Sequence, residues 1–203
     1  MKWPFFLFLS LFIPICSFAQ NDDFVRLDSL SPHFYYDIRY ATDNNFVEEA
    51  VYDCGVCLLR PDAAEALIKA NEYFMNQGYC IKLFDCYRPY DVQKKLWEIV
   101  PNPAYVADPY NGGSVHNRGA AVDLTLVDHN GDPVDFGTDY DFFGPKAHID
   151  NMNHSEEVLS NRKLLQEGLA KFGFKGIRTE WWHFSYTKNS GYPISNAPLP
   201  CKN

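Results

Sequence analysis

Four side chains in this sequence have the types and spacing that metal-dependent hydrolysis requires. His116 stands seven residues before Asp123, and Glu180 stands three residues before His183. Two imidazoles and one carboxylate form a three-ligand zinc set with an open fourth position, which is the catalytic rather than the structural pattern. The remaining carboxylate, Glu180, would be free to act as general base on the water that the metal activates. These residues therefore predict a zinc peptidase with one Zn²⁺ per chain.

The surroundings of these residues allow other interpretations. Asp123 lies in an apolar, β-prone run at residues 120–127, where a carboxylate needs a partner because burying it unpaired is costly. Metal ligation supplies one partner, and an ion pair with Arg118 is the alternative. Glu180 and His183 would face opposite sides of a regular strand, since alternate residues point to opposite faces. We therefore expect a bulge or turn that brings both side chains to the site.

The elements that must position these residues follow from apolar periodicity and from glycine and proline signals. Helices are expected at residues 61–77, 90–100 and 156–172. Strands are expected at residues 34–40, 79–86, 120–127, 132–136 and 176–186.

Two turns and loops add to this scheme. Asn130-Gly131 predicts a hairpin that joins the strand ending at residue 127 to the one beginning at residue 132. The long, partly aromatic loop at residues 137–153 is expected to form a wall of the site. Because regular βαβ alternation is absent, residues 20–203 predict one α+β domain with a mainly antiparallel central sheet flanked by helices.

Composition limits the function classes. The 203 residues are 46% hydrophobic and 16% aromatic, which favours a folded domain over disorder. The net charge of -8 and the pI near 5.1 give no basic footprint for nucleic acid, so no nucleic-acid partner is expected. We expect a small-molecule substrate instead.

The N-terminus has the pattern of an export signal. Residues 1–19 contain a charged start, an apolar run at residues 3–15 and a small-x-small ending at Ala19. This predicts a periplasmic or secreted protein without stable membrane insertion after cleavage. A membrane anchor is the alternative, although the run is short for a bilayer span. A lipoprotein signal ending at Cys16 is another, although Ile15 is bulky for such a site.

Cysteine usage agrees with an oxidising compartment. The five cysteines after residue 19 are Cys54, Cys57, Cys80, Cys86 and Cys201. Cys80 and Cys86 lie about 20 Å apart if the strand is extended, whereas a disulfide needs Cα atoms within about 7 Å. We expect at least one disulfide and one free thiol. Cys54 and Cys57 alone make only half of a zinc knuckle.

Taken together, the motifs resemble a known family. Ser-x-His-x-x-Gly-x-Ala-x-Asp followed by Glu-x-Trp-His resembles the zinc D,D-peptidases, which include VanX-type D-alanyl-D-alanine dipeptidases, VanY-type carboxypeptidases and the Hedgehog fold. The resemblance to the dipeptidase branch covers roughly residues 37–186. It includes Tyr40-Ala41-Thr42, Asn45-Phe46, Asp85-x-Tyr87-Arg88-Pro89, Asp123-Leu124-Thr125-Leu126, Gly137-x-x-Tyr140-Asp141-Phe142 and Asn161-Arg162.

The resemblance implies roles for further residues. Arg88 is similar to the family arginine that faces the tetrahedral intermediate, where a fixed guanidinium stabilises developing negative charge. Asp141 matches the carboxylate that receives the substrate ammonium. Ser114 and Tyr40 match groups near the C-terminal end of the substrate, although hydroxyls and loop acids often only cap turns. The implied reaction is hydrolysis of D-alanyl-D-alanine to free D-alanine.

Two other functions remain open. A D,D- or L,D-carboxypeptidase or endolysin-like peptidase acting on peptidoglycan stem peptides would need an open groove and no ammonium pocket. A non-catalytic, zinc-dependent wall-binding module would need neither Glu180 nor Arg88. The well-known resistance dipeptidases of this branch work in the cytoplasm, so the export signal favours scavenging of D-alanine from wall fragments.

Overall fold

The fold was analysed in a computed structural model that describes residues 24–189 and 191–201. The predicted signal segment, residues 1–19, lies outside the described residues. Among the residues that are described, no helix combines the length and the apolar character needed to cross a bilayer.

A five-stranded sheet forms the centre of the domain. Its strands, in spatial order, are β2 (Tyr35–Tyr36), β4 (Tyr79–Asp85), β5 (Ala121–Asp128), β7 (Glu180–Tyr186) and β6 (Phe174–Ile177). The β2–β4 pair is parallel, and the other three pairs are antiparallel. A second, small sheet pairs β1 (Val25–Arg26) with β3 (Leu58–Leu59). The predicted α+β class with a mainly antiparallel sheet is confirmed.

The three predicted helices are present and end one or two residues early. They are α2 (Pro61–Met75), α3 (Tyr90–Ile99) and α4 (Glu156–Ala170). Shorter pieces are α1 (Leu27–Leu30) and the 3₁₀ turns η1 (Arg39–Ala41), η2 (His116–Arg118) and η3 (Pro145–Ala147).

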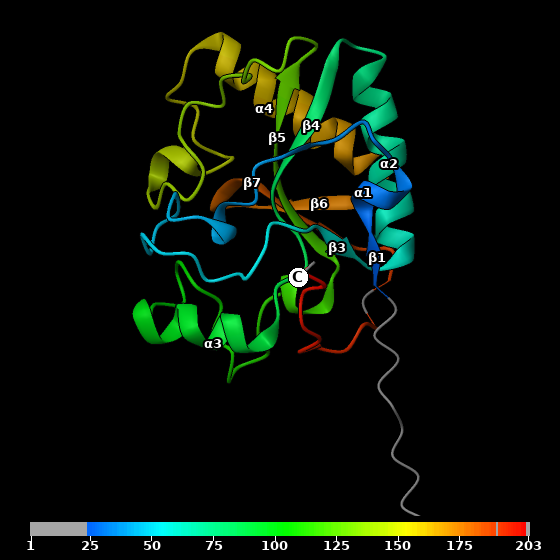
Figure 1. The fold of residues 1–203 in the computed structure, drawn as a ribbon. Helices are drawn as coiled ribbons and strands as arrows, with labels where there is room; N and C mark the ends of the chain where they lie inside the picture. The colour runs from blue at the N-terminus through cyan, green and yellow to red at the C-terminus, as the bar shows by residue number, and fades with distance from the viewer. Residues whose placement is uncertain (1–23, 190, 202–203) are drawn as a thin grey trace, which may run out of the picture.

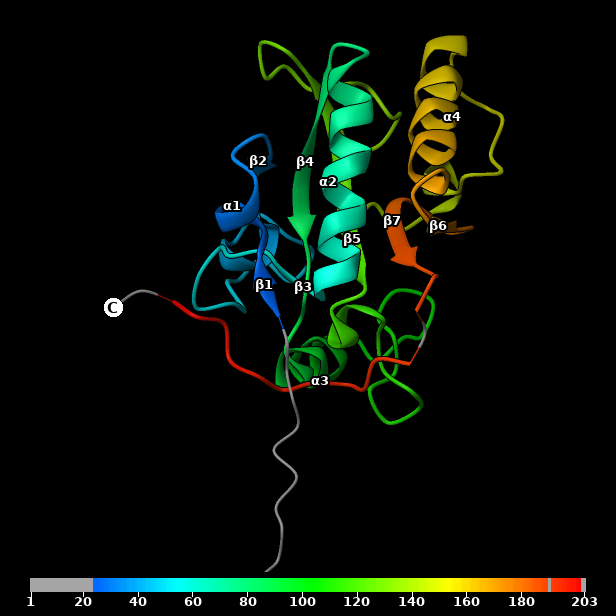
Figure 2. The same ribbon diagram turned by 90° about the vertical axis from the view of Figure 1, so that its right-hand side faces the viewer.

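Helices α2 and α4 pack on the same side of the sheet, whereas α3 lies beyond one end of it (Figures 1 and 2). The strands turn the fully buried side chains of Ile81, Leu83, Leu124 and Leu126 into the core. Because side chains alternate along a strand, the polar residues between them point to the opposite face. That face is therefore available for a site.

The register of the sheet aligns three polar residues. Asp123 on β5 lies opposite Asp85 on β4 and opposite His183 on β7. Directly paired residues project to the same face of a sheet. Residues that are 38 and 60 positions apart in the chain, counted from Asp123, are thereby placed in one row.

Three predicted strands were wrong in extent. The strand expected at residues 34–40 is reduced to β2, because the chain turns into η1. The strand expected at residues 176–186 is a hairpin of β6 and β7, and its turn falls at residues 178–179. Residues 132–136 make only an isolated bridge from Pro133 to Val127, since proline has no N–H with which to continue a ladder. The tight turn predicted at Asn130-Gly131 is present.

The loop at residues 137–153 is held against the domain by helix α4. The buried guanidinium of Arg162 donates to the carbonyl oxygens of Phe136, His148 and Lys146 at 2.9, 2.9 and 2.8 Å. The indole of Trp181 also donates to the hydroxyl of Thr138 at 2.8 Å. A loop held by this many bonds can act as the rigid wall that the sequence predicted.

Two disulfides are formed, Cys54–Cys201 and Cys57–Cys86. Within the described residues, Cys80 is the one free cysteine. The expectation of at least one disulfide and one free thiol is confirmed. The second bridge ties the end of β3 to the residue that follows β4, close to Asp85.

The disulfide pairing predicts the result of thiol counting. In a chain that begins after Ala19, denatured and not reduced, we expect one reactive thiol, and Cys80→Ser should remove it. Five free thiols in the unreduced protein would contradict both bridges.

Candidate active site

His116, Asp123 and His183 converge on one point on the polar face of the sheet. His116 Nε2 lies 3.1 Å from His183 Nδ1 and 3.2 Å from Asp123 Oδ1, and the last two atoms are 3.0 Å apart. Ligand atoms about 2.0–2.2 Å from a tetrahedral zinc lie roughly 3.3–3.6 Å from one another. This set of donors therefore fits a zinc ion with little adjustment.

The outer nitrogen of each imidazole has its own partner. His116 Nδ1 donates to the carbonyl oxygen of Cys86 at 2.6 Å. His183 Nε2 lies 3.1 Å from the hydroxyl of Ser185. Such contacts fix the tautomer and the orientation of a metal-ligating histidine. They leave Nε2 of His116 and Nδ1 of His183 to face the metal.

The chain between the first two ligands makes a tight turn. His116 begins η2, and Gly119 ends it with a φ of 67°. A side chain at Gly119 would be strained at this φ and would collide with the ring of Phe24. Glycine therefore allows the chain to pass directly from His116 into β5 and Asp123.

The alternative partner for Asp123 is excluded. The guanidinium of Arg118 donates to the carbonyl oxygens of Tyr192 and Gly112, not to Asp123. Burial alone would raise the pKa of Asp123, but the charges and hydrogen bonds of His116 and His183 outweigh it and hold the pKa below its ordinary value. Asp123 is thus an anion at neutral pH, as a metal ligand must be.

Glu180 lies at the start of β7, where the pairing with β6 is irregular. Gly176 pairs with Phe184, but the next residue, Ile177, pairs with Glu180. This shift in register brings Glu180 and His183 into the same cavity, as expected from their spacing. Burial raises the pKa of Glu180 to about 7. A carboxylate with that pKa can exchange protons near neutral pH, which suits a general base.

Arg88 is held from several sides. Its Nε and one terminal nitrogen donate to Asp85 Oδ2 at 3.1 and 2.7 Å, and the other terminal nitrogen donates to Gln93 at 2.9 Å. Its guanidinium carbon lies 4.9 Å from the centre of the Tyr40 ring. A guanidinium has five N–H donors, so donors remain for a substrate. The alternative of a surface ion pair is excluded because Arg88 is buried.

Asp141 and Tyr40 are in contact. The hydroxyl of Tyr40 donates to Asp141 Oδ2 at 3.2 Å. Asp141 adopts a φ of 59°, a left-handed conformation that is uncommon for residues other than glycine. Burial, together with the charges of Asp123 and Glu180, raises the pKa of Asp141 well above its ordinary value. A cationic group placed beside Asp141 would stabilise its charged form.

Ser114 has a structural contact in addition to its predicted one. Its hydroxyl oxygen accepts the backbone N–H of His116 at 3.2 Å, so it caps the turn that carries this ligand. The same residue lines the cavity that holds the other predicted side chains.

All eight side chains predicted from sequence line one small cavity of about 80 Å³. They are Tyr40, Arg88, Ser114, His116, Asp123, Asp141, Glu180 and His183. Phe46, Leu96, Tyr105, Val106 and Ile177 add apolar surface. Drug-sized ligands need cavities of about 300–1,000 Å³, so this cavity suits a much smaller molecule.

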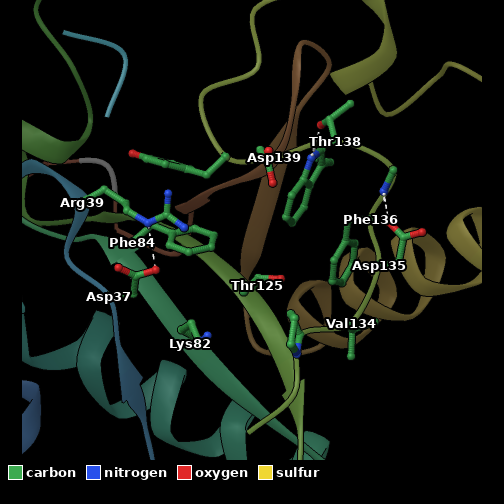
Figure 3. Close-up of a pocket in the computed structure, with 14 residues that line it drawn as sticks. Asp37, Arg39, Lys82, Phe84, Thr125, Val134, Asp135, Phe136, Thr138 and Asp139 are labelled. Carbon is green, nitrogen blue, oxygen red and sulfur yellow. Dashed lines mark hydrogen bonds and ion pairs between the residues drawn. The ribbon is translucent and has the colours of Figure 1, made fainter. Parts of the chain in front are cut away.

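A larger cavity of about 600 Å³ lies on the same face of the sheet but outside this constellation. Figure 3 shows Lys82, Phe84 and Thr125 on its floor, with residues 134–139 on the opposite wall. None of the candidate metal ligands lines it. Its size alone does not make it the reaction site.

Four contributors to the site were not assigned a role from the sequence. Asp85 accepts hydrogen bonds from Arg88 and, at 2.6 Å, from the hydroxyl of Tyr52. Gln93 holds Arg88, and Tyr140 contacts Asp123. Asp85 and Tyr140 lie within the matched motifs, which is a signal that could have found them. Tyr52 and Gln93 carry no local signal.

Comparison with known proteins agrees with this geometry. The Peptidase_M15 family, described as D-ala-D-ala dipeptidase, matches residues 20–199. The chain belongs to this family. It is therefore a metallopeptidase, and the resemblance seen in the motifs is confirmed.

Two curated members of the family match over most of their length. The D-alanyl-D-alanine dipeptidase of Escherichia coli (strain K12) is 34% identical over 183 residues, which cover 90% of this chain and 94% of that protein. The D-alanyl-D-alanine dipeptidase of Enterococcus faecium is 29% identical over 199 residues, which cover 88% and 98%. Among solved structures, the LdcB LD-carboxypeptidase matches with a TM-score of 0.44 and 22% identity, covering 64% of this chain and 59% of that one.

Proposed function

We propose that this peptidase hydrolyses the dipeptide D-Ala-D-Ala to two molecules of D-alanine in a zinc-dependent reaction. The observation that carries the proposal is the gathering of all eight predicted side chains around one small cavity. The dipeptidase names of the relatives in Escherichia coli and Enterococcus faecium support the substrate.

His116, Asp123 and His183 are the residues that would hold the zinc ion. Their three donor atoms are of the types that zinc prefers, and they leave room for a fourth ligand. When bound, zinc supplies Lewis acidity that makes a water molecule more acidic and withdraws electrons from the scissile carbonyl.

Glu180 acts as the general base. It removes a proton from the attacking water as the water adds to the peptide carbon, and it can then deliver that proton to the departing amine. Its position in the same cavity as the metal ligands suits both steps. Its pKa of about 7 matches a group that both accepts and donates a proton near neutral pH.

Arg88 stabilises the negative charge that develops on the carbonyl oxygen. Its contacts with Asp85, Gln93 and the Tyr40 ring hold the guanidinium in place before substrate binds. A donor that is already oriented costs no reorganisation during the reaction, so it lowers the energy of the transition state more than that of the substrate.

Asp141 receives the free ammonium of the dipeptide. A dipeptide carries this ammonium one residue before the scissile bond, whereas a longer peptide has a neutral amide there. Tyr40 orients Asp141 through its hydroxyl, and Ser114 lies near the C-terminal end of the substrate. An unpaired carboxylate facing an amide is penalised, so longer substrates are rejected by charge as well as by size.

We further propose that the protein is exported and recovers D-alanine from wall fragments. The supporting observations are the signal-like residues 1–19 and the two disulfides, which suit an oxidising compartment.

Substrate length tests the dipeptidase proposal against a carboxypeptidase. We expect hydrolysis of D-Ala-D-Ala and negligible cleavage of N-acetyl-D-Ala-D-Ala or of a stem pentapeptide. Asp141→Asn should raise KM for the dipeptide and narrow the difference between free and acetylated substrates. Asparagine is the suitable replacement because it tolerates the left-handed backbone at this position.

Asp139→Asn is the matched control, because Asp139 lies in the same loop but does not line the 80 Å³ cavity. It should leave the ratio of the two kcat/KM values unchanged. Comparable kcat/KM for the free and acetylated dipeptides in the unmodified enzyme would replace the dipeptidase by a carboxypeptidase.

A further inference from the structure

Tyr140 contacts the candidate metal site from outside the catalytic cavity. Its hydroxyl donates to Asp123 Oδ2 at 3.0 Å, whereas Oδ1 of the same carboxylate faces the two imidazoles. Tyr140 is buried, and it is not among the residues that line the 80 Å³ cavity. Its hydroxyl is therefore placed to act on the ligand rather than on the substrate.

The ring of Tyr140 is fixed by three aromatic neighbours. Its centre lies 4.7 Å from that of Phe84, 5.5 Å from that of Trp182 and 6.3 Å from that of Tyr40. Because these neighbours leave the ring little freedom, the position of the hydroxyl is set before a metal arrives.

The hydrogen bond restricts how Asp123 can bind a cation. With Oδ2 engaged by Tyr140, Oδ1 alone is directed at His116 and His183. Without the hydroxyl, Oδ2 would be a buried carboxylate oxygen that has lost this partner, and the carboxylate could rotate. Outer contacts of this kind orient ligands and tune the affinity of metal sites.

We propose that Tyr140 is a positioning residue that holds Asp123 as a single-oxygen metal ligand. The proposal rests on the metal role of Asp123 proposed above. Tyr140 also precedes Asp141 directly, so one short segment places both the ligand carboxylate and the carboxylate that receives the substrate ammonium.

Tyr140→Phe tests this role, because phenylalanine keeps the ring contacts and removes only the hydroxyl. Zinc affinity is measured by chelator competition with zinc alone, so the readout does not depend on turnover. We expect the zinc dissociation constant to rise about 10–100-fold, the range typical of lost outer contacts. In the cobalt(II) form, the visible absorption should change, since it reports the number and arrangement of ligands.

Tyr87→Phe is the matched control. Tyr87 is also fully buried, and its hydroxyl donates to the carbonyl oxygen of Ala197 at 3.0 Å, away from the metal ligands. This variant should bind zinc as the unmodified protein does. Unchanged zinc affinity and cobalt absorption in Tyr140→Phe, or an equal loss in Tyr87→Phe, would overturn the positioning role while leaving the peptidase proposal intact. Failure of the unmodified protein to bind zinc would instead defeat both.

Discussion

Glu180→Gln should abolish hydrolysis of D-Ala-D-Ala while zinc still binds. Glutamine keeps the shape of the side chain, but its amide cannot accept a proton from the attacking water. General base catalysis contributes about 10²–10⁴-fold, so kcat should fall by at least that order. Metal analysis should still find one zinc per chain, because Glu180 is not one of the three ligands.

Glu167→Gln provides the control for this experiment. Glu167 is a solvent-exposed glutamate on α4, with 66% of its side chain accessible. Its replacement should leave both zinc content and kcat unchanged. Near-normal turnover in Glu180→Gln would defeat the proposed mechanism.

The pH dependence of the unmodified enzyme gives a second view of the same residue. Burial raises the pKa of Glu180 to about 7, so its carboxylate is lost as the pH falls through that value. A bound cation favours the carboxylate and lowers the pKa. We therefore expect kcat/KM to fall on the acid side, with a midpoint at or below pH 7, and this acid limb should change in Glu180→Asp.

His116→Ala should lose both zinc and activity. The variant removes one of three protein ligands, and the two that remain no longer make a catalytic zinc set. Metal that binds the native state also stabilises it, so chelation should lower the melting temperature of the unmodified protein and have little effect on the variant. Metal analysis and thermal unfolding measure the two effects.

Proton competition gives a further expectation for zinc binding. Burial lowers the pKa of His116, but the charges of Asp123 and Asp85 outweigh it, so the net pKa is raised. A protonated imidazole cannot bind a metal. Zinc should therefore dissociate more readily as the pH falls through this raised pKa.

His154→Ala controls for loss of a histidine elsewhere. His154 is exposed and contacts the carbonyl oxygen of Lys146 in the loop at residues 137–153. Its replacement should not change zinc content. Full zinc in both His116→Ala and His183→Ala would rule out the proposed site.

Asp85 explains why the metal ligands and the catalytic arginine form one unit. It holds Arg88 through two hydrogen bonds, accepts the Tyr52 hydroxyl and lies 3.5 Å from His116 Nδ1. Its position opposite Asp123 places it in the same row of the sheet. A single carboxylate on β4 thus connects the two halves of the proposed mechanism.

The sequence by itself determined the chemistry of the site and most of the regular elements. Histidine, aspartate and glutamate have few other uses in an apolar run or beside paired tryptophans, so their types and order identified the candidate ligands and base. Helices α2, α3 and α4 were predicted to within two residues, because amphipathic periodicity and end signals are local properties.

Only the tertiary structure decided how these residues meet. The pairing of Asp123 with His183, the contacts of Asp85 and Tyr140, and the partner of Cys54, which is 147 residues away, join distant parts of the chain. The failure of residues 132–136 to form a strand shows the same limit, since their pattern alternated but Pro133 could not continue the ladder. Strand register and side-chain contacts depend on which surfaces pack together, and local periodicity carries no information about a partner far along the chain.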